Sequence, residues 1–241
     1  MEIEGVITSI TQYRESDGIV NFLTIDGFIS FTARGIFKID SKLSSVCQLY
    51  NFVKVEISES RKSGYYTLQS GQIIKSLKNV YENIEAMLTL GFIVELAKKT
   101  IDDDNKSKLY NCVLMAINCI VDKGDLVTIR LIYLANVINL VGLKLDVDEC
   151  IRCGSKKEII TLSLDDGGFV CRKCLNHADA TKTPLYIKLA RYVFITNMSE
   201  SIEKILPEFE SRTLFKDLYL FLSENLDIKL KSYELLGKIL Q

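Results

Sequence analysis

The chain has 241 residues, 48% of them hydrophobic, and a formal net charge of −1 at pH 7. It can bury one large core or two smaller ones, and its charge gives no overall sign of a polyanionic partner. The most apolar run, residues 126–143, is interrupted by Arg130, Asn136 and Asn139. It therefore predicts a buried helix, because a membrane span needs roughly 20 predominantly apolar residues. No signal peptide precedes the first strand-like segment, so we expect a soluble cytoplasmic protein.

Residues 1–80 predict a small β-barrel. Val53, Val55 and Ile57 alternate with polar residues, as a half-buried strand requires. Asp26-Gly27 predicts a hairpin turn, because both residues tolerate positive φ. Four more short strand-like runs lie at residues 3–10, 19–25, 28–33 and 65–74. Five strands in so short a region suit a five-stranded OB barrel, a fold that often binds nucleic acid.

The first third of the chain also holds a local excess of positive charge. Residues 28–80 contain eight Lys or Arg against three acids. A basic strip of this size favours contact with phosphates, but an ordinary solvated surface explains it equally well. Arg61 and Lys62 are expected at a hairpin tip, as a phosphate contact or as a plain exposed turn.

From residue 81 onward the hydrophobic period becomes helical. Asp125 and Gly142 are expected to begin and end one helix, and Thr183-Pro184 to begin another. An apolar stripe before Asp125 comprises Leu109, Cys112, Val113, Ala116 and Ile120. The predicted fold is α+β: an OB barrel over 1–80, then a helical domain over 81–149 and 183–241, interrupted by a cysteine-rich module over 150–182.

That module contains two closely spaced pairs of cysteines, Cys150 with Cys153 and Cys171 with Cys174. Two residues within each pair and seventeen between them is the spacing of a structural zinc site, in which a short hairpin brings two turns together. Four thiolates fill the tetrahedral shell of one Zn²⁺ per chain and leave no position for water. Unligated core cysteines and two disulfides are the alternatives. Seven cysteines and no secretory mark disfavour disulfides.

Nothing in the sequence favours catalysis. His177 is the only histidine, and no glycine-rich phosphate loop with a following lysine occurs. The acidic runs 102–104 and 165–166 are expected to be a helix start and a hairpin turn, not metal-dependent nuclease sites. We therefore predict a protein that is not an enzyme.

Several motifs, in this order, resemble the bacterial RecO family of recombination mediators and DNA repair proteins. They are Tyr13-Arg14-Glu15-Ser16-Asp17, Ala33-Arg34-Gly35, Gly142-Leu143, Leu164 to Cys174, and Leu230-Lys231-Ser232. The resemblance spans nearly the whole chain, although it is loose between motifs. Two positions depart from the family: Leu49-Tyr50-Asn51-Phe52 lacks a frequent proline, and Tyr233 stands where a basic residue is common.

The resemblance implies an OB fold, a helical domain and a zinc module. It also implies binding to single- and double-stranded DNA, strand annealing, contact with the tail of single-stranded DNA-binding protein, and work with RecR to place RecA on coated single strands. An alternative is a zinc-ribbon and OB scaffold subunit of a transcription or translation assembly, without annealing activity.

Together with the family match, the charges select candidate DNA-binding residues. We expect Arg34, Lys38 and Lys42 along the barrel groove and Arg14 in the preceding turn. Phe28 and Phe37 are either rings on which bases stack or packed side chains, and Phe31 is expected in the core.

Two further sets of basic residues are candidates for partner contacts. Arg130 is expected to rim a groove for the acidic, aromatic-ended tail of single-stranded DNA-binding protein, or else to be a core-edge arginine paired with an acid. Arg152, Arg172 and Lys173 lie within the cysteine pairs. They are expected either to contact DNA or RecR, or to stabilise the dianionic four-thiolate centre.

Overall fold

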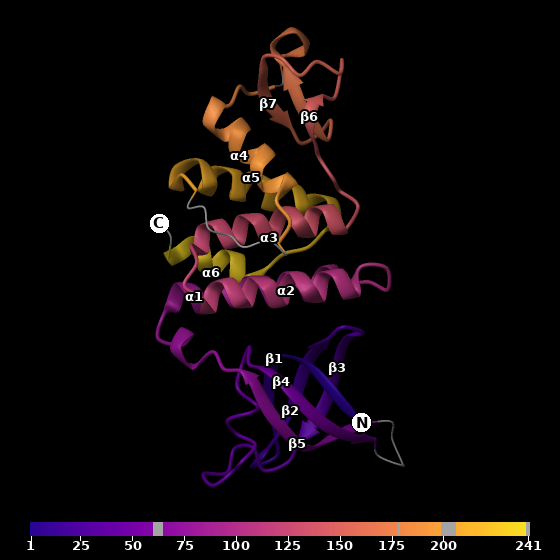
Figure 1. Cartoon of the computed structure of the whole chain (residues 1–241), viewed down its shortest axis with the longest axis vertical. Coiled ribbons are helices and arrows are strands. Elements are labelled where there is room, and N and C mark those ends of the chain that lie inside the picture. Colours follow the sequence, from indigo (N-terminus) through magenta and orange to yellow (C-terminus); the bar gives the residue numbers. More distant parts are fainter. Residues whose placement is uncertain (60–64, 178, 199–205, 240–241) are drawn as a thin grey trace. The chain divides into compact units, whose positions relative to one another are not determined.

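The computed structural model describes residues 1–59, 65–177, 179–198 and 206–239 (Figure 1). Arg61 and Lys62, predicted at a hairpin tip, lie outside the described residues. Backbone packing groups the chain into two compact units, residues 1–114 and 115–241, and each is described by itself. The domain boundaries suggested by the sequence stay predictions.

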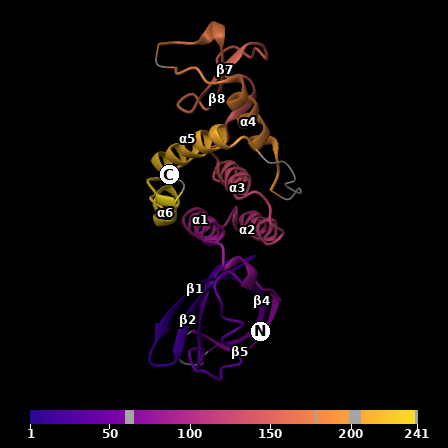
Figure 2. The ribbon, with the colours of Figure 1, turned by 90° about the vertical axis from the view of Figure 1, so that its left-hand side faces the viewer.

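The first unit begins with a closed five-stranded barrel, which confirms the predicted fold class. Its strands are β1 (Glu2–Tyr13), β2 (Asp17–Thr24), β3 (Gly27–Ala33), β4 (Phe52–Glu59) and β5 (Tyr66–Lys75). They follow the order β1-β2-β3-β5-β4, and β4 pairs with β1 to close the ring. Figure 2 shows β1 and β2 on one side of the barrel and β4 and β5 on the other. All pairings are antiparallel except that of β3 with β5.

The barrel interior is filled by the side chains that alternation predicted. Val53, Val55 and Ile57 are buried, whereas the polar residues between them are not. Phe31 packs edge-on against Phe22, with ring centroids 5.6 Å apart, which confirms Phe31 as a core residue. The predicted hairpin joins β2 and β3, but its turn residues are Ile25 and Asp26 rather than Asp26 and Gly27. Gly27 begins β3 with φ of +111°.

Six helices lie in the described part of the chain. They are α1 (Ile84–Thr100), α2 (Lys106–Val121), α3 (Leu126–Leu140), α4 (Pro184–Ile195), α5 (Glu208–Leu226) and α6 (Lys231–Ile239). The predicted helix starts are correct: the side chains of Asp125 and Thr183 accept hydrogen bonds from backbone amides two or three residues into α3 and α4. Gly142, with φ of +83°, follows the end of α3.

Helix α3 forms the centre of the second unit. Residues 128–135 are buried without interruption, so every face of the helix is covered, as the apolar run predicted. Both α4 and α5 pack on it, and Figure 1 shows α5 running beside it. None of the helices described is long and apolar enough to cross a membrane.

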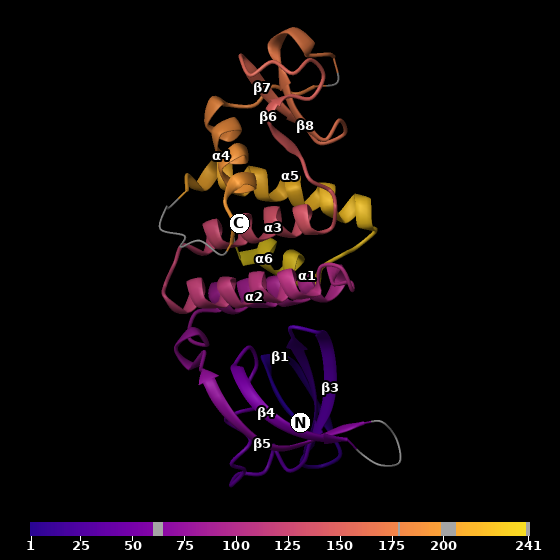
Figure 3. The same ribbon diagram turned by 45° about the vertical axis from the view of Figure 1, so that its right-hand side comes forward.

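The cysteine-rich module is built on a small sheet of β6 (Asp146–Cys150), β7 (Ile159–Ser163) and β8 (Gly168–Cys171), shown side by side in Figure 3. The predicted hairpin is the antiparallel pair β7 and β8. Strand β6 is parallel to β8 and was not predicted. Asp165 and Asp166 lie in the expected hairpin turn. The acidic run 102–104, expected at a helix start, lies just before α2, whose first turn contains no acid.

Candidate metal centre and basic surfaces

The two cysteine pairs meet at one point. Cys150 ends β6 and Cys171 ends β8, while Cys153 and Cys174 lie in the short turns that follow. The four sulfurs lie within 4.8 Å of one another, and the Sγ atoms of Cys153 and Cys171 are 3.7 Å apart. The structure thus confirms the convergence predicted from the spacing. All four residues are free cysteines, which excludes the two-disulfide alternative.

The first turn has the geometry of a metal knuckle. The amides of Cys153 and Gly154 donate to the carbonyl oxygen of Cys150 at 3.2 and 2.7 Å, and Gly154 has φ of +71°. The amide of Cys171 donates to the Sγ of Cys150 at 3.4 Å. Amides directed at a sulfur favour its thiolate form, which is the form that binds metal.

The pKa values of two of the thiols shift in opposite directions. Burial disfavours ionisation of Cys150, but the amides of Cys171, Arg152 and Cys153 outweigh it and lower its pKa to about 6. The pKa of Cys174 is raised to about 12, chiefly because Cys174 hydrogen-bonds the Cys153 side chain, with burial second. A bound cation would allow all four sulfurs to ionise, so this all-sulfur donor set fits a metal ion.

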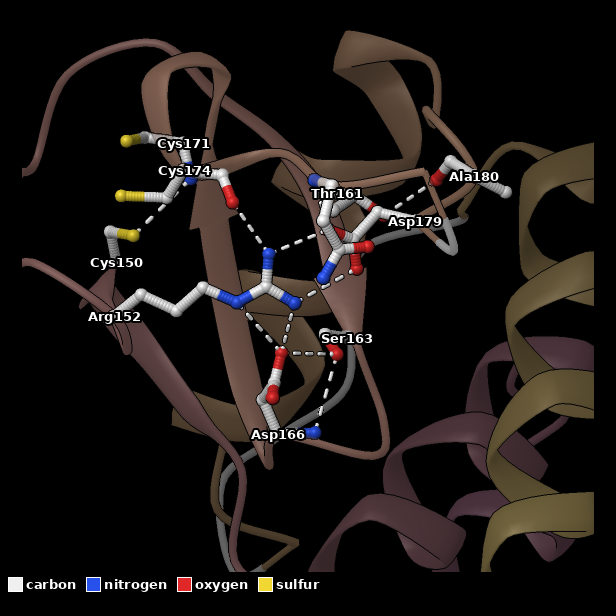
Figure 4. Close-up of polar contacts among 10 residues, drawn as sticks. Cys150, Arg152, Thr161, Ser163, Asp166, Cys171, Cys174, Asp179 and Ala180 are labelled. Carbon is white, nitrogen blue, oxygen red and sulfur yellow. Dashed lines mark hydrogen bonds and ion pairs between the residues drawn. The ribbon is translucent and has the colours of Figure 1, made fainter.

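The Arg152 side chain points into the module, and its guanidinium lies among Asp166, Asp179 and Cys174 (Figure 4). Its Nη1 donates at 2.6 Å to both the carbonyl oxygen of Cys174 and Asp179 Oδ2. Its Nη2 donates to Asp179 Oδ1 at 3.1 Å and also to Asp166, and its Nε donates to Asp166 Oδ2 at 3.0 Å. Its hydrogen bonds to Asp179 and Asp166 raise the pKa of Arg152 above its ordinary value. Of the knuckle residues considered for DNA or RecR contact, Arg172 and Lys173 are exposed.

The four candidate DNA-binding residues are all exposed on two connected segments of the barrel. Arg14 lies in the turn between β1 and β2, whereas Arg34, Lys38 and Lys42 follow β3. The Gly35 amide donates to Asp17 Oδ1 at 2.8 Å, and the Phe37 amide donates to the carbonyl oxygen of Ser16 at 3.0 Å. These hydrogen bonds hold the two segments together. We define the basic face as Arg14, Arg34, Lys38 and Lys42.

Two aromatic rings border this face. Phe37 is 48% exposed, and one edge of its ring covers Gly18, where a Cβ atom would lie 3.3 Å from its Cε2. Tyr13, which the sequence reasoning missed, is 44% exposed, and the guanidinium of Arg14 lies 5.1 Å from its ring centroid. Phe28 is half-buried. The adjacent Tyr13-Arg14 pair was the signal that could have found the second ring.

Arg130 is 2% exposed and lines a pocket of about 160 Å³ in the second unit. It is therefore a buried wall residue rather than an exposed rim. The remaining lining residues are Val127, Arg212, Phe215, Lys216, Tyr233, Leu236 and Gly237. Arg212 and Lys216 are exposed and lie one turn apart on α5. Sequence reasoning missed this basic pair, although its spacing of four residues on a helix was a signal.

The aromatic wall of the pocket is rigidly supported. Tyr233 stacks on Tyr219 with ring centroids 3.5 Å apart, and it lies 5.8 Å from the ring of Phe215. The Tyr219 hydroxyl accepts a hydrogen bond from the Leu230 amide at 3.0 Å. The pocket thus combines aromatic side chains with three arginine or lysine residues.

Comparisons with known proteins assign a family to this combination of barrel, helices and four-cysteine module. Residues 1–77 match the family described as Recombination protein O N terminal, and residues 81–234 match Recombination protein O C terminal.

Individual relatives agree as well. The chain is 30% identical over 190 residues to the DNA repair protein RecO of Bacillus pumilus, covering 78% of this chain and 73% of the relative. It is 31% identical over 172 residues to that of Bacillus cytotoxicus, covering 70% and 68%. The chain belongs to the RecO family.

The cysteine geometry predicts one metal ion per chain. In the purified, unchelated protein, elemental analysis should find a metal-to-protein ratio near one, and Cys171→Ser should reduce it strongly because a sulfur ligand is lost. The matched control is Cys112→Ser, a change in a half-buried cysteine on α2. A ratio near zero in the parent protein would show that the cluster does not hold a metal.

Proposed function

We propose that this protein is a DNA-binding recombination mediator in DNA repair. It binds single- and double-stranded DNA, anneals complementary strands and, with RecR, helps to load RecA onto single strands coated by single-stranded DNA-binding protein. Membership of the RecO family supports the role, and the names of the relatives place them in DNA repair. Such a protein would work at the nucleoid in the cytoplasm. The proposal requires binding, and no catalytic residue.

The observation that carries the proposal is the basic face. Its four cations lie on two segments that hydrogen bonds hold together, and all four are exposed to solvent. Each cation can neutralise a backbone phosphate and release a condensed counterion. Because these contacts go to the backbone, they suit a protein that must bind DNA of any sequence.

Tyr13 and Phe37 add a contact for bases to this face. Stacking on an aromatic ring contributes about 1–3 kcal/mol per base and accepts every base. One edge of the Phe37 ring lies near Gly18, and about half of the residue stays open to solvent. Since bases in a duplex are already stacked on each other, these rings favour single strands.

The helical pocket is proposed as the site for the tail of single-stranded DNA-binding protein. An acidic tail that ends in an aromatic residue needs cations at the entrance and an apolar wall inside. Arg212 and Lys216 supply the exposed cations, and Phe215 and Tyr233 supply the rings. Tyr233, at a position where the family often has a basic residue, thus makes this pocket more aromatic. Arg130 contributes positive charge from within the wall.

We propose Zn²⁺ as the ion of the four-cysteine site, because a set of four sulfurs and no oxygen ligand selects a soft or borderline metal with tetrahedral geometry. The ion would organise the module, since four protein ligands leave no position for a reacting water. Exposed Arg172 and Lys173 on the second knuckle would then present positive charge to DNA or RecR.

The basic face predicts a defined salt dependence. Each phosphate neutralised on a single strand contributes about −0.7 to the slope of log K against log salt, so replacing Arg34, Lys38 and Lys42 together by Ala should flatten the slope by about 2. Annealing should slow, with an unchanged circular dichroism spectrum, because exposed substitutions rarely affect stability. Fluorescence anisotropy with labelled single strands at several salt concentrations measures the slope.

The matched control removes the same charge from elsewhere in the first unit. Lys98, Lys99 and Lys108 are exposed on α1 and α2, and their replacement by Ala should leave the slope as in the parent. If both triple variants flatten the slope equally, net charge and not the basic face drives binding. If the parent itself binds bare DNA without salt dependence, the scaffold alternative is favoured.

If Phe37 stacks on bases, its removal should lower the affinity for single strands by the same factor at every salt concentration. Phe37→Ala should weaken binding to single strands about tenfold, within the range of one lost stacking contact, while the salt slope and the affinity for duplex stay as in the parent. Phe209→Ala is the control, because Phe209 is a 76% exposed aromatic residue on α5. Equal affinities of parent and Phe37→Ala for single strands would exclude a stacking role.

The pocket predicts selective loss of peptide binding. Replacing Arg212 and Lys216 together by Glu should weaken binding of an acidic peptide that ends in phenylalanine by tenfold or more, because attraction becomes repulsion. Binding of bare single strands should be little changed. These exposed positions are a better test than Arg130, whose replacement by Glu would bury a negative charge.

Calorimetric titration of the peptide measures the effect. The control is Lys188→Glu, a charge reversal at an exposed position of α4 outside the pocket lining. Unchanged peptide affinity in the double variant would place the site elsewhere.

A further inference from the structure

Arg152 uses its whole guanidinium group inside the cysteine module. An arginine has five N–H donors in a fixed planar arrangement. Here five donor contacts run from its three nitrogens to Asp166, Asp179 and the carbonyl oxygen of Cys174. No N–H remains for a phosphate or a partner protein. The contact with DNA or RecR considered for Arg152 is therefore replaced by an internal role.

The partners of Arg152 belong to separate segments of the module. Arg152 lies between Cys150 and Cys153 in the first knuckle, Asp166 lies in the hairpin turn, and Asp179 follows the second knuckle. The contact with the backbone of Cys174 reaches the fourth sulfur-bearing residue itself. One side chain from the first knuckle thus ties down the hairpin and the second knuckle together (Figure 4).

Both acids are held in position from their far side. The Ser163 hydroxyl donates to Asp166 Oδ2 at 2.8 Å, and the Asn176 amide donates to Asp179 Oδ2 at 2.8 Å. The Asp179 side chain is only 7% exposed. Because Asp179 is fixed and shielded, its hydrogen bonds to the charged guanidinium restrict the knuckles more than surface ion pairs would, whereas Asp166 is 37% exposed and is held by Ser163.

Apolar packing within the module is sparse. The buried cluster around the sulfurs consists of Cys150, Val170 and Cys171, with Ile159 and Cys174 packed against it. Two of the three buried members are themselves candidate ligands. Ligand geometry must then be supported by polar contacts, as outer-shell hydrogen bonds do for many metal sites.

We propose that Arg152 is the positioning residue of the metal centre, which locks Cys174 and the hairpin against the first knuckle so that the four sulfurs are aligned for the ion. This rests on the zinc site proposed above. Lysine cannot replace Arg152 fully, because one ammonium with three donors cannot span both acids and the carbonyl in a planar array.

The test measures zinc release from the full-length protein with a chelating chromophore. Arg152→Met keeps an unbranched apolar stem and removes every donor, and should release zinc at least about tenfold faster, as loss of outer-shell contacts does elsewhere. Arg152→Lys should give an intermediate rate, since it restores charge and part of the hydrogen bonding. Arg172→Met is the matched control: Arg172 is exposed and also adjoins a cysteine of the cluster, and its rate should equal that of the parent.

A spectroscopic readout separates positioning from general loss of stability. In the cobalt-substituted protein, the visible and charge-transfer bands report tetrahedral thiolate coordination. Arg152→Met should alter these bands, and Arg152→Lys should restore them in part, whereas Arg172→Met should leave them unchanged. Parent-like bands and a parent-like release rate in Arg152→Met would overturn the proposal.

Failure of the zinc site and failure of the Arg152 proposal give different results. If the parent protein holds no zinc, the zinc site itself fails before Arg152 is tested. If Arg152→Met does not fold, Asp179→Asn serves instead, because it keeps Arg152 and weakens one acceptor. It should accelerate zinc release, and a parent-like rate in both Asp179→Asn and Arg152→Lys would overturn the role of Arg152.

Discussion

Four cysteine sulfurs lie within 4.8 Å of one another, and four thiolates cannot share that space without a cation. The module around them depends on this constraint, because its own buried cluster is small and includes two of the four cysteines. Small units with little apolar core commonly need a metal to supply folding free energy. The three short strands, the two knuckles and the Arg152 network all serve to bring the sulfurs to one point. The module is therefore a scaffold in which the geometry of the four sulfurs and the binding of a metal ion would be coupled.

The barrel solves a different problem, since its core is apolar and needs no ion. Side chains such as Phe22, Phe31 and Val55 fill the interior. The outer loops are then free to carry charge and exposed rings at little cost in stability. Two hydrogen bonds, from Gly35 to Asp17 and from Phe37 to Ser16, are enough to join the loops into one surface. Binding chemistry on loops with a rigid barrel beneath them is a common division of roles.

The helical unit buries Arg130, which sequence reasoning placed either at the rim of a groove or at the edge of the core. Helix α3 is covered on all sides, so Arg130 cannot point into open solvent. It reaches the pocket wall, and the exposed cations come from α5 instead. The apolar run that correctly predicted the buried helix already implied this burial. The buried positive charge of the pocket thus comes from α3, and its exposed positive charges come from α5.

Local rules determined much of this protein from the sequence alone. The cysteine spacing, the caps at Asp125 and Thr183 and the alternation of Val53, Val55 and Ile57 depend on neighbours a few residues away, so they could be recognised without a structure. Only the tertiary structure decided that Arg152 meets Asp166 and Asp179, which lie 14 and 27 residues further on.

It also decided that Phe37 rests on Gly18 and that the wall of the Arg130 pocket includes Tyr233. These contacts join segments that are distant in the chain. No short-range pattern encodes them, because they arise only when the strands and helices pack and decide which side chains lose contact with water.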